Sequence, residues 1–105
     1  MKQHKEFQYV YNKGKNAHSS SVVLFYLPAN GVKRVGFTAT KKIGNSEIRT
    51  RSKRRFRALF SEFSSLLNDG TYIFVAKVAL KETSYLSLQN DFKKVLTKAG
   101  VLHND

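Results

Sequence analysis

The 105-residue sequence contains no cysteine, one proline and only seven acidic residues. The lack of cysteine excludes disulfides and thiolate zinc sites, and it agrees with a reducing compartment. No stretch approaches eighteen consecutive apolar residues, and no signal-like apolar segment follows the first residues. Glycine and proline are sparse, with no internal repeat and no low-complexity linker. We therefore expect a single domain over residues 1–105, located in the cytoplasm and without a membrane partner.

Residue types that perform catalysis are few and scattered. His4, His18 and His103 stand in polar surroundings without a cysteine or a paired carboxylate nearby. The acidic residues form no pair at the spacing of a general acid and base, and the sequence has no glycine-rich phosphate loop or nucleophile motif. We expect no catalytic residue, no metal site and no cofactor in the protein itself.

Positive charge dominates the composition. Nineteen lysines and arginines give a formal net charge of +12 at pH 7. Repulsion among so many like charges destabilises a folded chain. The positive charge also favours a nucleic acid or an anionic membrane as the partner. Because 41% of the residues are apolar and 12% aromatic, we predict a folded domain with a modest two-layer core and not a disordered basic tail.

The charge is concentrated in residues 41–57, which hold eight cations and one acid, Glu47. A charged run is usually only a solvated face, but a net charge of +7 over seventeen residues is too dense for that interpretation. Five of the eight cations are arginines, whose guanidinium groups bind phosphate bidentately and stack on bases. RNA is therefore a better candidate partner than a membrane.

Much of this basic stretch should lie on a long helix. From Ile48 onward the apolar residues gather on one side of a helix with 100° per residue, and Asn45 or Ser46 is the predicted N-cap. The helix should run to about Leu67. Cations near its start oppose the helix dipole, so the pattern favours phosphate binding over helix stability. The side opposite the apolar residues carries Thr50, Lys53, Arg54 and Arg57.

Two shorter helices are predicted near the ends of the chain. Residues 5–13 have an apolar face with helical spacing, and Gly14 can close that helix as its C′ residue. The final helix should start near Ser84 and end at Gly100. Its packing residues are Leu88, Phe92, Val95, Leu96 and Ala99.

Three to four strands complete the predicted fold. Residues 15–21 can hold an irregular first strand, and the apolar run 22–27 should form a hairpin with the alternating residues 34–40. Residues 71–76 are nearly all apolar and predict the most central strand. Because a helix separates the last two strands, that pair should be parallel. The expected fold is an α+β two-layer sandwich with a mixed sheet.

The strand at residues 22–27 is apolar on both faces. Val23, Phe25 and Leu27 share one face by the two-residue period of a strand. Helices must cover one face of the sheet, and the other can be a stacking platform for single-stranded nucleic acid. For Phe25, as for Phe7, Tyr11 and Phe37, a place in the core is the better interpretation of each residue taken alone.

Three segments of the sequence carry a more specific signal. They are residues 7–11 (FQYVY) with Gly14, residues 34–45 (RVGF leading to KKIGN), and residues 49–54 (RTRSKR). Together they resemble the protein component of bacterial ribonuclease P. The resemblance implies an accessory subunit whose RNA partner holds the active site, uses magnesium and removes the 5′ leader of precursor tRNA. It also implies a left-handed crossover between the parallel strands, against the general right-handed rule.

The resemblance further implies roles for two sets of residues. The long basic helix would contact the catalytic RNA, and the sheet face beside the first helix would bind the leader of precursor tRNA. Thr50 departs from the family, which usually has asparagine there. The implied RNA-contact residues are Arg49, Thr50, Arg51, Lys53, Arg54 and Arg57 with Lys41 and Lys42, and the implied leader-binding residues are Phe7, Tyr11, Lys13, Val23 and Phe25.

Two alternatives to this assignment differ in class. A general RNA-binding or ribosome-associated module would show the same basic helix and the same apolar sheet face. A freestanding nuclease is disfavoured because no cluster of acids is present to hold a metal ion.

Overall fold

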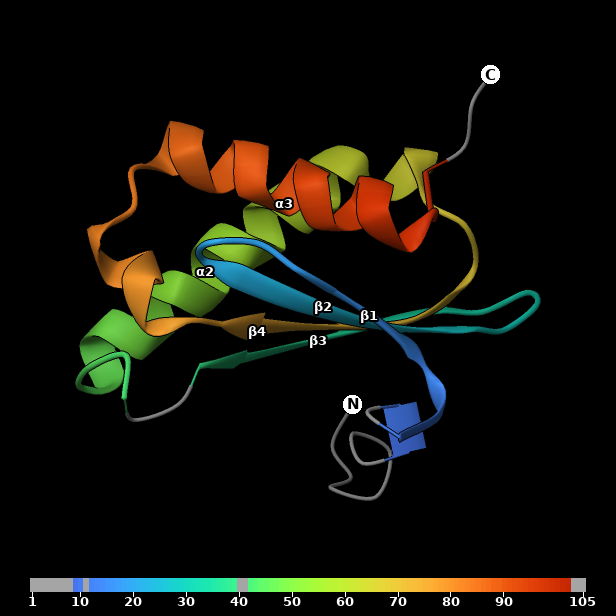
Figure 1. The fold of residues 1–105 in the computed structure, drawn as a ribbon, viewed down its shortest axis with the longest axis horizontal. Coiled ribbons are helices and arrows are strands. Elements are labelled where there is room, and N and C mark those ends of the chain that lie inside the picture. The colour runs from blue at the N-terminus through green and yellow to red at the C-terminus, as the bar shows by residue number, and fades with distance from the viewer. Residues whose placement is uncertain (1–8, 11, 40–41, 103–105) are drawn as a thin grey trace.

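The computed structural model describes residues 9–10, 12–39 and 42–102. Strands β1 (Lys15–His18), β2 (Val22–Pro28) and β3 (Lys33–Ala39) precede helix α2 (Ser46–Phe63), strand β4 (Gly70–Ala76) and helix α3 (Tyr85–Ala99). Two 3-10 helices, η1 (Ser64–Leu66) and η2 (Val78–Glu82), follow α2 and β4 respectively. Figure 1 shows α2 and α3 together on one side of the sheet. The predicted α+β class and the order of these elements are confirmed.

The four strands form one mixed sheet in the order β1-β2-β4-β3. Strand β2 pairs antiparallel with β1 and with β4, whereas β3 pairs parallel with β4. The predicted hairpin between residues 22–27 and 34–40 is therefore wrong, because β4 lies between these two strands. Strand β4 has buried residues on both of its faces, which a central position provides. The parallel β3–α2–β4 arrangement is as predicted, and the left-handed crossover stays a prediction.

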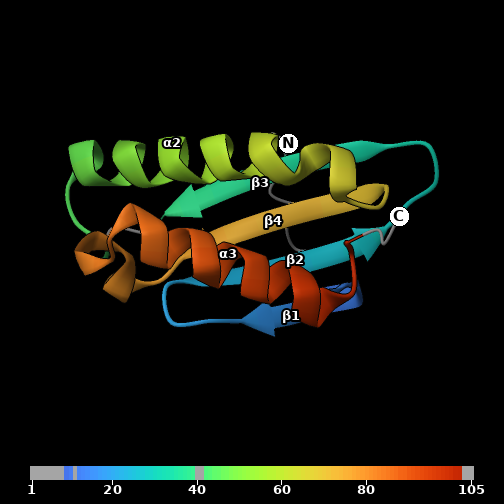
Figure 2. The ribbon, with the colours of Figure 1, turned by 90° about the horizontal axis from the view of Figure 1, so that it is seen from above.

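Phe74 of β4 is the centre of the core. Its ring stacks on Phe92 of α3 with 4.4 Å between the ring centroids. Phe37 of β3 and Phe60 of α2 each lie 5.9 Å from it, and Phe56 of α2 lies 6.2 Å away. Full burial of a side chain of this size contributes about 1.5–3 kcal/mol to the free energy of unfolding. One strand thus anchors both helices, which Figure 2 shows side by side across the sheet.

Two tyrosines fix the turn from α2 into β4. The Tyr26 hydroxyl donates to the carbonyl of Asp69 at 2.8 Å, and the Tyr72 hydroxyl donates to the carbonyl of Asn68. The Asp69 carboxylate also accepts the Gly31 N–H at 3.0 Å, which ties the β2–β3 connection to the same turn. Burial raises the pKa of both tyrosines, and the Asp69 charge adds to the effect. Both hydroxyls therefore stay protonated donors at neutral pH.

Helix α3 begins and ends as predicted, whereas α2 is shorter. Ser84 caps α3 and Gly100 follows it with a left-handed φ of 69°. Helix α2 ends at Phe63, and the chain continues as η1 before it turns towards β4. Leu66, predicted on the apolar side of the helix, is consequently exposed, and Leu67 is buried in extended backbone that bridges to residue 102.

A helical segment lies on the opposite face of the sheet from α2 and α3 (Figure 1). Residues 9–10 and 12–13 are helical, and Val10 is buried. Gly14 follows this segment, as predicted, and its N–H donates to the Val10 carbonyl at 2.8 Å. The φ of Gly14 is not positive, so this glycine closes the segment without the left-handed backbone usual at such a position. A Cβ at this position would lie 2.5 Å from the Tyr26 carbonyl oxygen and 2.7 Å from that of Val10.

We expect Gly14→Ala to lower the free energy of unfolding by about 1–3 kcal/mol, the usual effect of overpacking, because both close atoms belong to the backbone. Urea unfolding followed by circular dichroism measures the change. Asn12→Ala is the control, since Asn12 is exposed in the same segment. Equal stability of the two variants would contradict a tight approach at Gly14.

Candidate nucleic-acid interface

The start of α2 is fixed by the residues just before it. The Asn45 side chain accepts the Ile48 N–H at 3.0 Å and is the N-cap, one of the two candidates predicted. Ile43 is fully buried and anchors the connector to the core. Gly44 has a φ of 153°, and a Cβ there would lie 2.8 Å from the Ile48 side chain. Residues 43–45 therefore set the position from which the basic helix begins.

We call the solvent side of α2 the outer face. Its exposed residues include one hydroxyl and four cations, while Ser52, Phe56 and Leu59 on the inner side are buried. The prediction that Thr50, Lys53, Arg54 and Arg57 point away from the core is confirmed. Because the inner side is held by the aromatic core, the spacing of the outer cations is rigid. The outer face consists of Thr50, Arg51, Lys53, Arg54 and Arg57.

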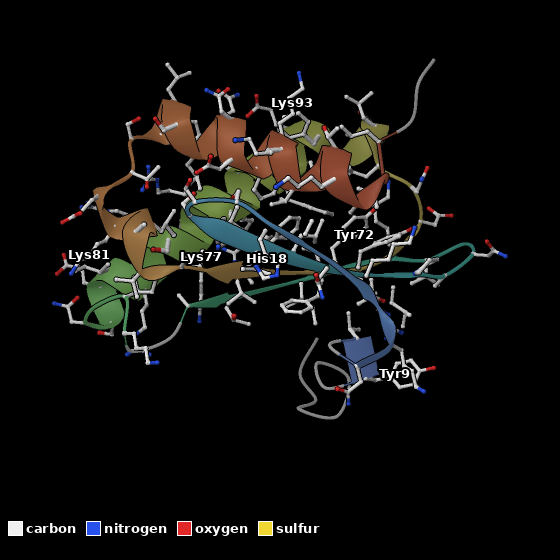
Figure 3. The ribbon with its side chains drawn as sticks, viewed as in Figure 1. Tyr9, His18, Tyr72, Lys77, Lys81 and Lys93 are labelled. Carbon is white, nitrogen blue, oxygen red and sulfur yellow. The ribbon has the colours of Figure 1, made fainter. Side chains whose placement is uncertain are left out.

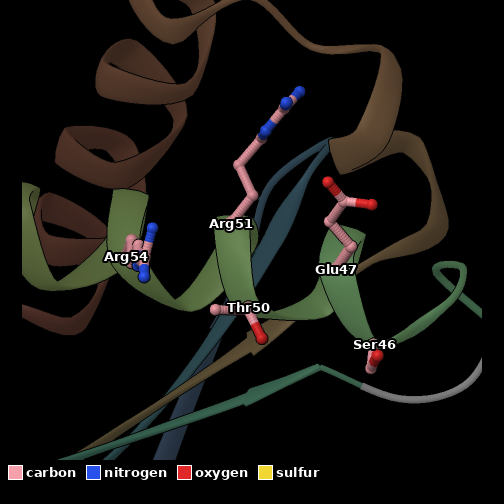
Figure 4. A pocket seen from close by; sticks show the side chains of 5 residues that line it. All are labelled: Ser46, Glu47, Thr50, Arg51 and Arg54. Atoms are coloured by element: carbon pink, nitrogen blue, oxygen red, sulfur yellow. The ribbon is translucent and has the colours of Figure 1, made fainter.

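A hollow of about 340 Å³ lies at the N-terminal end of the outer face. Figure 4 shows Arg51 and Glu47 extending from the same side of the helix. Guanidinium groups and a hydroxyl at this spacing suit the oxygens of a phosphodiester, and the helix N-terminus adds a favourable field. Glu47 is the one acid at this site and opposes an anion. The hollow is lined by Ser46, Glu47, Thr50, Arg51 and Arg54.

Two predicted RNA-contact arginines are partly engaged with the protein. Arg49 is half-buried, and its Nε is shielded from solvent without a hydrogen-bond partner. The Arg57 guanidinium lies 5.8 Å from the centroid of the Phe37 ring, within the range of a cation–π contact. Of the two predicted lysines before the helix, Lys42 is exposed and Lys41 lies outside the described residues.

Arg55 has a structural contact that the sequence did not indicate. Its Nη2 donates to the Thr83 carbonyl at 2.8 Å, and its guanidinium lies 5.9 Å from the centroid of the Tyr85 ring. Burial lowers the pKa of Arg55, and the charge of Arg51 lowers it further. A helical wheel places Arg55 beside Ile48, at the edge of the apolar side of the helix. That position is the sequence feature that could have indicated contact with the rest of the protein.

The face of the sheet opposite α2 and α3, here called the far face, has an apolar centre. Phe25 of β2 pairs with Ile73 of β4, and in the next row Val23 pairs with Val75. Ile73 is fully buried and Val23 is 8% exposed, whereas Phe25 and Val75 are half-buried. On the outer strands the Phe25 row ends at Asn16 of β1 and Gly36 of β3, and the Val23 row ends at His18 of β1 and Thr38 of β3.

The structure places three of the five predicted leader-binding residues. Val23 and Phe25 lie on the far face, and neither belongs to the core cluster under the helices. Lys13 is exposed in the helical segment on that same side. Phe7 and Tyr11 fall outside the described residues. A half-buried aromatic ring beside aliphatic side chains is able to stack on an unpaired base.

The described part of the chain also lacks the features of two other functional classes. Within residues 9–10, 12–39 and 42–102, no three His, Cys, Asp or Glu side chains are grouped so that they could hold a metal ion. No helix in that part of the chain is long and apolar enough to span a membrane.

Comparison with known proteins agrees with the geometry. A sequence model of the family Ribonuclease P matches residues 1–100. The chain belongs to the ribonuclease P protein family. It is accordingly a protein subunit of ribonuclease P, an accessory component of an endoribonuclease that is a ribonucleoprotein.

Curated relatives and a solved structure cover almost the whole chain. The ribonuclease P protein component of a Nitratiruptor species is 39% identical over 98 residues, which are 93% of this chain and 89% of the relative. That of Clostridium kluyveri is 32% identical and covers 96% of this chain and 94% of the relative. The RNase P protein of Staphylococcus aureus has a TM-score of 0.89 at 27% identity, with 98% of this chain and 96% of that chain covered.

The contacts of Arg55 generate a prediction about stability. We expect Arg55→Ala to lower the free energy of unfolding by about 1–2 kcal/mol, because it removes a hydrogen bond from a charged donor to the Thr83 carbonyl. Arg54→Ala, which removes the same charge from the neighbouring exposed position, should change it by less than about 0.5 kcal/mol. Urea unfolding of both variants tests the difference, and equal losses would show that Arg55 is no more structural than Arg54.

Proposed function

We propose that the outer face of α2 binds the catalytic RNA of ribonuclease P. The observation that carries this proposal is the row of four exposed cations on a helix whose opposite side is locked into the core. A preformed cationic surface neutralises phosphates without first ordering its own backbone. The proposed RNA contacts also include Arg49 and Lys42 and, by its place in the sequence alone, Lys41.

We infer that the far face binds the single-stranded 5′ leader of precursor tRNA. Phe25 and Val23 offer an apolar surface on the side of the sheet away from α2, and Lys13 supplies a nearby cation. Phe7 and Tyr11 complete the proposed set. Stacking on aromatic rings tolerates any base, which suits a leader that differs among tRNAs.

On this proposal the protein contributes binding and electrostatics, and hydrolysis belongs to the RNA partner with magnesium. Two RNAs that must approach each other repel through their phosphates. Fixed lysine and arginine side chains offset that repulsion in place of some of the divalent ions. The protein would act in the cytoplasm, where precursor tRNA is processed.

A reconstitution assay tests the proposal against a general RNA-binding role. Purified protein added to the catalytic RNA should restore cleavage of precursor tRNA at a magnesium concentration where the RNA alone is slow. A general RNA-binding protein of similar charge would not restore it. Absence of any stimulation would overturn the proposed function.

The proposed RNA contact predicts a change in salt dependence. We expect the double variant Lys53→Ala, Arg54→Ala to flatten the plot of log affinity against log salt by roughly one to two units, because each phosphate contact releases counterions. Filter binding with the catalytic RNA at several salt concentrations gives the slope.

The matched control for this measurement is Lys93→Ala, Lys94→Ala. These two lysines are exposed on α3, so the control removes the same net charge from a different surface. Equal slopes for the two double variants would mean that RNA responds to net charge alone and not to the outer face of α2.

The proposed leader contact predicts a loss that depends on the leader. Phe25→Ala should weaken binding of leader-bearing precursor tRNA to the reconstituted enzyme by about 1–3 kcal/mol, the usual value of one stacked base. Binding of mature tRNA should not change, because mature tRNA lacks the leader. Leu86→Ala, which removes an apolar side chain 69% exposed near the start of α3, is the control.

A half-buried Phe25 can also support the fold, so melting temperatures are measured beside the affinities. Phe25→Leu keeps apolar packing while it removes the aromatic ring. If Phe25→Leu folds normally and binds both tRNAs as the unmodified protein does, the leader assignment of Phe25 is wrong.

A further inference from the structure

A second basic hollow lies on the other flank of α2, where η2 packs against the N-terminal half of the helix. We call it the α2–η2 groove. Its volume is about 260 Å³. Figure 3 shows Lys81 of η2 beside this end of α2, well away from Lys93 on the outer side of α3. The groove is lined by Ile48, Arg51, Ser52, Arg55, Lys81 and Glu82.

The charges of the groove are not balanced within the protein. Arg51, Arg55 and Lys81 face a single acid, Glu82. Within the described residues, no ion pair or hydrogen bond holds the side chains of Arg51, Lys81 or Glu82. The proximity of Arg51 and Arg55 also lowers the pKa of Arg55, after the larger effect of burial. Three cations beside one acid leave the groove with an excess of positive charge that can attract an anion.

The geometry of the groove is preorganised. Arg55 is fixed by its hydrogen bond to the Thr83 carbonyl, directly after η2, and by the ring of Tyr85. Ser52 is buried and donates to the Ile48 carbonyl at 3.0 Å, so the floor of the groove is part of the helix itself. An anion that enters the groove therefore meets one positioned guanidinium, that of Arg55, beside the side chains of Arg51 and Lys81, which are unpaired within the described residues.

The groove is continuous with the outer face, because Arg51 lines both hollows. We propose that the α2–η2 groove holds a backbone phosphate of the same catalytic RNA that the outer face binds, with Arg51 shared between the two contacts. This inference rests on the proposed function. It extends the RNA surface beyond the segment 49–57 to Lys81, which lies in a separate element after β4.

Lys81→Ala tests the groove directly. Lys81 is exposed and has no hydrogen bond within the described residues, so its removal should leave the fold intact. The slope of log affinity for the catalytic RNA against log salt should fall by about 0.7–0.9, the value for one phosphate contact. Lys93→Ala on α3 removes the same charge elsewhere and should leave the slope unchanged. Equal effects of the two variants would overturn the proposal.

Glu82→Gln provides a test of opposite sign. Removal of the one acid in the groove should raise affinity for the catalytic RNA about two- to fivefold at low salt, because the repulsion of the phosphate is lost. Glu62→Gln is the control, since Glu62 lies in the last turns of α2 and accepts a hydrogen bond from Gln89. Unchanged affinity for Glu82→Gln would contradict an anion in the groove.

Two further comparisons separate the possible failures. If Lys53→Ala, Arg54→Ala flattens the slope and Lys81→Ala does not, the groove assignment is wrong while the proposed function stands. If neither variant changes the slope, the proposed function fails as well. A single-stranded leader oligonucleotide is titrated in parallel, and an effect of Lys81→Ala on that titration alone would also overturn the proposal.

Discussion

The stacking of Phe74 on Phe92, with 4.4 Å between the ring centroids, is the contact on which the other parts of the structure depend. It joins the central strand to α3, and the rings of Phe56 and Phe60 join the same strand to α2. Strand β4 also supplies the backbone pairing for both β2 and β3. Because Phe74 contacts both helices from the central strand, the inner side of α2 is held by the core. This packing does not depend on what covers the outer face of α2.

That independence explains how α2 carries so much like charge. Its first turn contains Glu47 as the only acid, and the arginines that follow repel one another and oppose the helix dipole. Local interactions along the helix would not stabilise such a sequence. The core does so instead, through the buried side chains of Phe56 and Leu59. The cations of the outer face are thereby available to an external anion. A basic helix that is fixed by the core therefore indicates a binding surface, which a disordered basic tail does not.

The sequence predicted the helices and strands themselves better than it predicted which strands pair with each other. Asn45, Ser84 and Gly100 mark helix ends through local chemistry, so these boundaries were predictable. Apolar content also identified β4 as central, yet the pairing of β2 with β3 was predicted wrongly, because alternation gives a strand its faces and not its partner. The partners of Arg55 and Lys81 could not be predicted for a related reason, although the helical wheel places Arg55 at the edge of the apolar side. Their contacts arise only when η2 packs against α2, an approach between segments far apart in the sequence.

The two surfaces proposed to bind RNA lie on opposite sides of one sheet, and this separation has a physical consequence. The outer face and the α2–η2 groove belong to the helical layer, whereas Phe25 and Val23 face away from it. Neither surface needs the other to be empty, so the two proposed ligands, the catalytic RNA and the substrate strand, can be held at the same time. The buried sheet between them is stiff and close-packed, so it fixes the distance between the two ligands. On the proposed function, an accessory subunit can then assist cleavage by setting where the substrate strand lies relative to the partner RNA.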